Sequence, residues 1–225
     1  MSKMKIIFVT DLHGNEAKYR RVFKAAKDHK AAAVVNGGDM LVLEGDLHGS
    51  QRDFIEGFLS PYFGEYEKAG IYHLGLLGND DLKIHDSFFD EVCRKYKTAF
   101  NLAQQLVELN GFNFIGMNWV TDYPFRLKDR CLKDGPGYVF QEQFGAGLLS
   151  TSEGFKELED WPAYAGTLPT IEEELAVLPR PRTDGKTIYV IHMPPSGVGL
   201  DVIRSGEKVG SRAVAGFIKK TQPLL

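Results

Sequence analysis

Residues 5–15 read KIIFVTDLHGN, in which a run of branched and aromatic side chains changes abruptly to a polar segment. The apolar half, Lys5–Thr10, has the composition of a buried β-strand. A helical pattern follows from about Glu16 to His29, and Asn15 stands where a helix N-cap is expected. A strand followed at once by a helix is typical of a layered α/β domain, and it places Asp11 and His13 at the carboxyl end of the strand.

Short apolar runs recur along the rest of the chain. The further predicted strands are Ala31–Val35, Ile71–Leu77, Phe112–Ile115 and Thr187–Ile191. Asn101–Leu109 has helical spacing, and Thr170-Ile171-Glu172-Glu173 has the form of a helix capping box. The stretch from about 120 to 169 is rich in glycine, proline and aromatic residues without a clear period, which predicts an irregular insertion. We expect one α/β domain over residues 1–225.

Composition limits the possible functions. With 43% hydrophobic and 25% charged residues, the 225-residue chain is globular. Its net charge of -3 argues against broad nucleic-acid binding, which needs many Lys and Arg side chains. Cys93 and Cys131 stand singly, as in reduced intracellular proteins. The N-terminal stretch Met1–Lys5 is followed by too few apolar residues for a signal peptide or a membrane span, so we expect a cytoplasmic protein without a membrane partner.

One tetrapeptide occurs twice. Asp11-Leu12-His13-Gly14 is repeated as Asp46-Leu47-His48-Gly49. The first copy follows a predicted strand, whereas the second is expected in a polar loop after Asp39. Because nothing around the two copies repeats, we interpret the match as chance.

Metal-competent side chains follow several of the predicted strands. They are Asp11, His13, Asp39, Asn79 and His192. Because ligands bind at the carboxyl ends of strands in sheets with crossover helices, these residues can converge although they are far apart in sequence. Their oxygen and nitrogen donors suit Mn, Fe, Co or Zn. Each residue alone could be a helix cap, a turn residue or a core histidine, but their coincidence favours a metal site.

These residues and their neighbours resemble the motifs of calcineurin-like metallophosphoesterases. The motifs are Asp11-Leu12-His13-Gly14-Asn15, Gly38-Asp39, Gly78-Asn79-Asp80-Asp81 and His192, in that order. The stretch from His192-Met193-Pro194-Pro195 through Gly210-Ser211 to Pro223 resembles that of small prokaryotic members. The resemblance implies a four-layer α/β/β/α sandwich with two mixed β-sheets. It also implies a phosphodiesterase or phosphomonoesterase that acts on a small-molecule or nucleotide substrate.

The resemblance further implies two divalent metal ions. Asp11 and His13 would bind the first ion, Asn79 and His192 the second, and the Asp39 carboxylate both. Mn is the first expectation for the metal, with Fe, Zn and Co as alternatives. Such a pair activates water and neutralises phosphate charge. Asn15 would contact a substrate phosphate, although helix capping explains this residue equally well.

The chain departs from the family pattern after the Gly-Asn pair. Much of the family has a histidine there that protonates the leaving oxygen, whereas this chain has Asp80. An aspartate beside two cations stays ionised and is a poor general acid. His48 or His85 could supply the proton, although each is more often a surface histidine. The alternative function is a non-catalytic protein-interaction module on the same fold.

The second departure concerns the last family motif, Gly-His-x-His, which has no counterpart before Leu225. Gln222–Leu225 looks like the start of the strand that leads into it, which favours a shortened C-terminus. Each ion would then keep three protein ligands, so we expect weak metal binding and low activity. An unpaired sheet edge would favour pairing with another chain, which leaves a homo-oligomer open.

Overall fold

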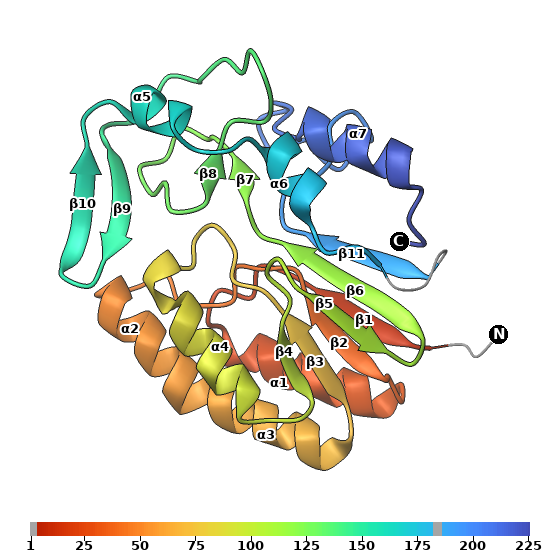
Figure 1. Cartoon of the computed structure of the whole chain (residues 1–225). Coiled ribbons are helices and arrows are strands. Elements are labelled where there is room, and N and C mark those ends of the chain that lie inside the picture. Colours follow the sequence, from red (N-terminus) through yellow and green to blue (C-terminus); the bar gives the residue numbers. More distant parts are fainter. Residues whose placement is uncertain (1–3, 182–185) are drawn as a thin grey trace. The chain divides into compact units, whose positions relative to one another are not determined.

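The computed structural model describes residues 4–181 and 186–225 (Figure 1). The chain divides into two compact units, Met1–Ala103 and Gln104–Leu225, and each is described by itself. The single domain over 1–225 remains a prediction, and most of the N-terminal stretch Met1–Lys5 lies outside the described residues. Among the described helices, none has the length and apolar character needed to cross a membrane.

The first unit is built on a parallel four-stranded sheet. Its strands follow the order β1 (Ile6–Val9), β2 (Ala33–Asn36), β3 (Tyr72–Gly75) and β4 (Ala99–Asn101). The register sets Val9 beside Asn36 and Asn36 beside Gly75. The carboxyl ends of the first three strands are therefore level, and the loops that carry Asp11, Asp39 and Asn79 leave from the same edge. The predicted strands are confirmed to within two residues at each boundary.

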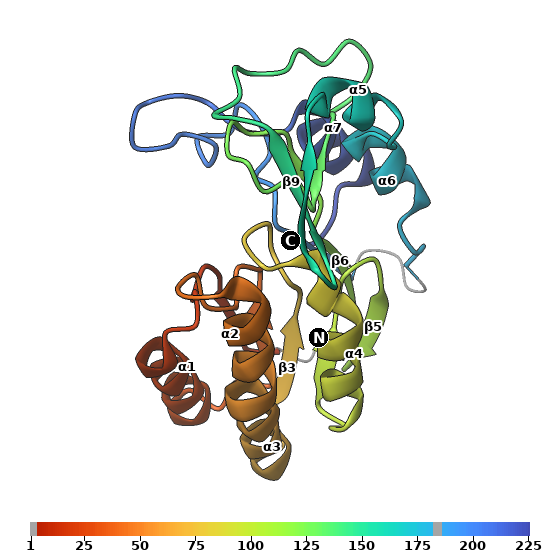
Figure 2. The same ribbon diagram turned by 90° about the vertical axis from the view of Figure 1, so that its left-hand side faces the viewer.

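The helices of this unit cover one face of the sheet (Figures 1 and 2). They are α1 (Glu16–Asp28), α2 (Leu47–Phe54), the π-helical turn η1 (Ile55–Leu59), α3 (Ser60–Ala69), the 3-10 turn η2 (Lys83–His85) and α4 (Asp86–Arg94). Right-handed crossovers that always step to the next strand bring every helix to the same side. Aromatic rings fill the space beneath them, and Tyr19 contacts Tyr62 edge-on at a centroid distance of 5.3 Å.

The second Asp-Leu-His-Gly copy is not in a loop, so that expectation is wrong. Asp46 is the N-cap of α2, and its carboxylate accepts hydrogen bonds from the backbone N–H groups of His48 and Gly49, each at 3.3 Å. A side-chain acceptor at this position satisfies helix donors that otherwise have no partner. Leu47, His48 and Gly49 therefore form the first turn of a helix.

The second unit contains a mixed three-stranded sheet. Its strands follow the order β11 (Thr187–Ile191), β6 (Phe112–Met117) and β5 (Leu106–Leu109), with β11 parallel and β5 antiparallel to β6. The helix predicted over Asn101–Leu109 is therefore wrong. Asn110 and Gly111 both have positive φ angles, of 52° and 78°. This favours a tight hairpin turn, and the resulting strand pairing overrides the helical spacing of the side chains.

The stretch 120–169 is more regular than predicted. It contains the short strands β7 (Val120–Thr121) and β8 (Cys131–Leu132), the hairpin β9 (Gly147–Thr151) with β10 (Gly154–Leu158), and the helix α5 (Trp161–Gly166). That the stretch is an insertion into the domain remains a prediction. The remaining helices of the unit are α6 (Ile171–Val177), which has the predicted capping box at Thr170, and α7 (Arg212–Thr221).

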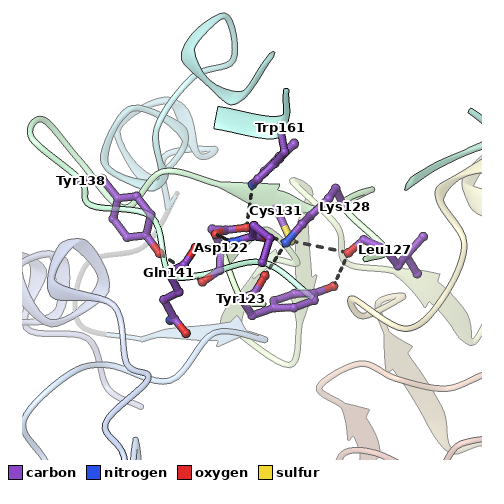
Figure 3. Close-up of polar contacts among 9 residues, drawn as sticks. Asp122, Tyr123, Leu127, Lys128, Cys131, Tyr138, Gln141 and Trp161 are labelled. Atoms are coloured by element: carbon purple, nitrogen blue, oxygen red, sulfur yellow. Dashed lines mark hydrogen bonds and ion pairs between the residues drawn. The ribbon is translucent and has the colours of Figure 1, made fainter. Parts of the chain in front are cut away.

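A buried ion pair organises this stretch (Figure 3). Lys128 Nζ lies 2.8 Å from Asp122 Oδ1, and both side chains are fully buried. The indole N–H of Trp161 donates to Asp122 Oδ1, and Gln143 donates to Asp122 Oδ2, each at 2.8 Å. The Tyr138 hydroxyl donates to the Asp122 backbone oxygen at 3.1 Å. Buried charges require such partners, so this network fixes loops that have few ladder hydrogen bonds of their own.

The protein is therefore a mixed α/β protein, as predicted. The described strands form the parallel sheet β1–β4, the mixed sheet β11-β6-β5, the antiparallel pair β9–β10 and the parallel pair β7–β8. The four-layer stacking of sheets and helices remains a prediction. Cys93 and Cys131 are buried and free. Near the end of the sequence, Leu224 N–H donates to Thr187 O at 2.9 Å, and Leu225 O accepts from Tyr189 N–H at 3.0 Å. These two residues thus bond to β11, although neither belongs to a strand.

Candidate metal centre

The loop after β1 runs beside the loop after β2. The backbone N–H groups of Asp11, His13 and Gly14 donate to the carbonyl oxygens of Gly38, Asp39 and Met40, each at 3.0 Å. These bonds continue the β1–β2 pairing beyond the ends of the strands. These backbone contacts hold Asp11 and His13 against Asp39.

The three predicted ligands of this edge have unusual backbone conformations. The φ angles are 56° for Asp11, 45° for His13 and 51° for Asp39. A positive φ angle is rare outside glycine, although aspartate and histidine tolerate it better than most residues. Each such residue costs about 1–3 kcal/mol and persists where the surrounding structure enforces it, often at functional sites. The interloop hydrogen bonds provide that enforcement here.

The side chains of these three residues converge. One ligand atom from each of Asp11, His13 and Asp39 lies within 4.8 Å of the other two. Metal–oxygen and metal–nitrogen bonds of about 2.0–2.2 Å keep two ligands of one ion within about 4.4 Å of each other, so these atoms are close enough to share an ion after small side-chain adjustments. His13 Nδ1 is buried and has no hydrogen-bond partner among the described residues. Two carboxylates and an imidazole nitrogen without a partner therefore fit one divalent ion of the predicted class.

Exposure differs across this cluster. Asp39 is only 4% exposed, whereas the Asp11 side chain is 52% exposed. The His13 side chain has an intermediate exposure of 30%, and its Nε2 lies 3.9 Å from Asp11 Oδ1. The cluster thus has a buried side at Asp39 and a side open to solvent at Asp11, from which a ligand can approach.

The loop after β3 brings Asn79 to the same edge. The backbone N–H of Asp80 donates to Asp39 Oδ1 at 3.0 Å, and Asn79 Nδ2 donates to Asp80 Oδ1 at 2.9 Å. Asp80 therefore orients the Asn79 amide while its own backbone contacts the Asp39 carboxylate. A Cβ atom at Gly78 would collide with Oδ1 and the backbone nitrogen of Asp39, so this close approach requires glycine.

The side chain of Asp81 connects the loop after β2 to the loop after β3. Its buried carboxylate accepts from Gly78 N–H at 2.7 Å, Met40 N–H at 2.9 Å and Leu41 N–H at 2.8 Å. Burial, together with the negative charge of Asp39, raises the pKa of Asp81 to about 7, although these backbone donors oppose the rise. Sequence reasoning gave Asp81 no role, even though it closes the Gly78–Asp81 motif.

Tyr19, on α1, supports the loop after β2. Its hydroxyl donates to the Met40 carbonyl at 2.8 Å, and the ring is fully buried. No motif marks this residue, because its spacing within the helix is that of an ordinary core position. Burial strongly raises the pKa of the Tyr19 hydroxyl, which therefore remains a hydrogen-bond donor.

The remaining predicted residues have diverse surroundings. Asn15 Oδ1 accepts from Lys18 N–H at 3.0 Å, which confirms the N-cap of α1. His48 lies in the first turn of α2, with Nδ1 3.9 Å from Asp46 Oδ1. His85 is buried, so its expected surface position is wrong, and burial lowers its pKa. His192 follows β11 in the second unit, and its backbone N–H donates to Met117 O at 3.0 Å. The roles of Asn15, His48 and His192 remain predictions.

Comparison with known proteins adds independent findings. A family model described as calcineurin-like phosphoesterase matches residues 4–222. The crystal structure of TT1561 of Thermus thermophilus is similar, with a TM-score of 0.59, 17% identity, and coverage of 99% of this chain and 80% of that chain. A second crystal structure gives a TM-score of 0.58 at 17% identity, with coverage of 97% and 80%. Both likenesses concern the fold alone. No curated protein sequence matches the chain.

Proposed function

The chain belongs to the calcineurin-like phosphoesterase family, and on that premise we propose that it is a dimetal-dependent hydrolase of phosphate esters. The proposed substrate is a small-molecule or nucleotide phosphomonoester or phosphodiester. The observation that carries the proposal is the convergence of Asp11, His13 and Asp39, whose ligand atoms lie within 4.8 Å of one another. Their strained backbones support it further, because strain of this kind concentrates at functional sites.

The proposed ligand assignment follows the family pattern. Asp11 and His13 hold the first ion, Asn79 and His192 hold the second, and Asp39 contributes to both, with Mn as the expected metal. When bound, such a pair supplies a water nucleophile at neutral pH and neutralises charge on the phosphate. Asn15, which follows the Asp11–Gly14 loop directly, is proposed to contact the phosphate with the part of its amide that does not cap α1.

The protein's own side chains decide how the leaving group departs. Asp80 accepts a hydrogen bond from Asn79 and stands next to Asp39, so its proposed role is to orient Asn79 rather than to donate a proton. His48 is then the proposed proton donor, because it is the partly exposed histidine of the helix that follows the Asp39 loop. Because residue 80 supplies no acid and His48 would have to donate from a different segment, esters whose leaving groups are stable as anions should react fastest.

A substrate panel tests the proposal. Purified protein with Mn²⁺ would be assayed on an aryl phosphodiester, an aryl phosphomonoester, a cyclic nucleotide and a dinucleotide pyrophosphate. Mn²⁺-dependent hydrolysis of at least one of them is expected. Mn²⁺ binding without turnover of any member of the panel would contradict the catalytic role.

The alternative, a non-catalytic interaction module, has one observation in its favour. The segment 198–203 of the second unit exposes Val198, Leu200, Val202 and Ile203, with Leu200 75% exposed. Contiguous exposed apolar side chains often mark contact surfaces. Replacing Leu200 with serine should leave hydrolysis unchanged if the protein is an enzyme, and should weaken recovery of a protein partner if it is an interaction module.

A further inference from the structure

The side chain of Gln51 connects two loops at the metal edge of the first unit. Gln51 lies on α2 and is fully buried. Its Nε2 donates to Val42 O at 3.1 Å and to Asp80 O at 3.0 Å, while its Oε1 accepts from Leu82 N–H at 2.8 Å. One amide therefore contacts the loop after β2 and, twice, the loop after β3.

These two loops carry proposed metal ligands. Asp39 precedes Val42 in the first loop, and Asn79 precedes Asp80 in the second. Gln51 contacts the backbone on both sides of Asp81, whose carboxylate joins the loops at Gly78, Met40 and Leu41. The second loop is thus fixed at Gly78 by one side chain and at Asp80 and Leu82 by the other.

The position demands a primary amide. Val42 O and Asp80 O need donors, Leu82 N–H needs an acceptor, and all three are met at one buried point. Among the side chains of this length, only glutamine supplies two N–H donors and a carbonyl acceptor together. Leaving a buried backbone group without a hydrogen-bond partner costs about 1–3 kcal/mol of folding free energy. An apolar side chain in place of Gln51 would therefore favour separation of the two loops.

We propose that Gln51 is a positioning residue of the metal centre. It sets the separation between Asp39 and Asn79 without contacting an ion or the substrate. The inference rests on the proposed function, since it concerns the same ligands. The proposal also assigns a role to α2, the helix that begins within the second Asp-Leu-His-Gly copy. Gln51 lies on this helix, four residues after Leu47.

The test measures the dissociation constant for Mn²⁺ alone, by isothermal titration on folded protein well below its melting temperature. Gln51→Met keeps the size of the side chain and removes both kinds of hydrogen bond. Gln51→Asn keeps the amide but shortens it by one methylene, so that it cannot reach both loops. Loss of partners that support metal ligands typically weakens metal binding by about 10–100-fold, and we expect a weakening in this range for both variants.

Gln143→Met is the matched control. Gln143 also donates from Nε2, at 2.8 Å to the buried Asp122, but it lies in the second unit. The Gln143→Met substitution should lower the melting temperature of the protein and leave its dissociation constant for Mn²⁺ unchanged. Circular dichroism would establish that each variant is folded, and Gln51→Asn would decide the matter if Gln51→Met does not fold.

The outcomes separate this inference from the proposed function. If the wild-type protein binds Mn²⁺ and the Gln51 variants bind it equally well, Gln51 has only a structural role and the inference is overturned. If the wild-type protein binds no Mn²⁺, the proposed function itself fails, and the inference with it. A weakening with the Gln51 variants but not with Gln143→Met supports both.

Discussion

The backbone N–H of Asp80 donates a 3.0 Å hydrogen bond to Oδ1 of Asp39, and this contact joins residues that are 41 positions apart in sequence. It places the loop after β3 directly against the carboxylate that is proposed to serve both metal ions. Because Asn79 Nδ2 also bonds to Asp80 Oδ1, the orientation of one proposed ligand is coupled to the position of another.

Asp39→Asn should preserve the fold and abolish most activity. The amide oxygen can still accept the hydrogen bond from Asp80, so the change in unfolding free energy should be within about 1 kcal/mol. The lost negative charge would weaken the binding of both ions. The value of kcat/KM for an aryl phosphodiester should therefore fall at least about 100-fold, which exceeds the usual effect of removing a residue that only supports a metal ligand. Asp53→Asn, on the exposed face of α2, is the control. Turnover near the wild-type rate would refute the shared-ligand assignment.

Gly78→Ala should destabilise the first unit. The new methyl group would meet the Asp39 carboxylate and backbone, and such overpacking costs about 1–3 kcal/mol in urea unfolding. Gly57→Ala is the matched control, because a Cβ there meets nothing within 4 Å and should stabilise the helical segment slightly. Equal effects of the two substitutions would show that Gly78 is not closely packed against Asp39.

The identity of residue 80 should control the choice of leaving group. Without an efficient general acid at position 80, aryl esters should be hydrolysed much faster than alkyl esters, because acid assistance is worth about 10²–10⁴-fold and matters most for basic leaving groups. Asp80→His should lower the ratio of the hydrolysis rate of aryl esters to that of alkyl esters. Asp80→Asn, which keeps an acceptor for Asn79, should leave that ratio alone. An unchanged ratio in the histidine variant would count against the account.

Lys128→Met should strongly destabilise the second unit. Removing one partner of a fully buried ion pair leaves the Asp122 charge without its cation, at a typical cost of about 3–5 kcal/mol. Thermal and urea unfolding would measure the loss. The double variant Asp122→Leu with Lys128→Met should recover part of it, because no buried charge remains unpaired. A single variant as stable as the wild type would mean that the pair contributes little.

Sequence alone predicted the elements whose signals are local. Residues 5–15 predict β1, the N-cap at Asn15 and the ligand pair Asp11 and His13, because strand composition and capping chemistry are encoded within a few positions. The strands that precede Asp39 and Asn79 were predicted for the same reason. The convergence of Asp11, His13 and Asp39 followed from the general behaviour of strand ends in α/β sheets.

The errors have two sources, long-range strand pairing and a helix cap that resembles a loop residue. Leu106–Leu109 has helical spacing but pairs with β6 through the Asn110-Gly111 turn. The helix at Leu47–Phe54 is not evident from the sequence, because its N-cap, Asp46, is a residue type equally common in loops. Gln51 carried no signal at all. A glutamine becomes informative only once the backbone groups that it contacts are known.

The most direct test of the dimetal hydrolase account is a Mn²⁺ titration of metal-free protein, with bound metal and hydrolysis of an aryl phosphodiester measured on the same samples. The account predicts no hydrolysis without metal and a rate that rises with Mn²⁺ occupancy, and it predicts that His13→Ala lowers occupancy and rate together. Hydrolysis that persists after complete removal of metal, or full Mn²⁺ occupancy with no hydrolysis, would contradict it.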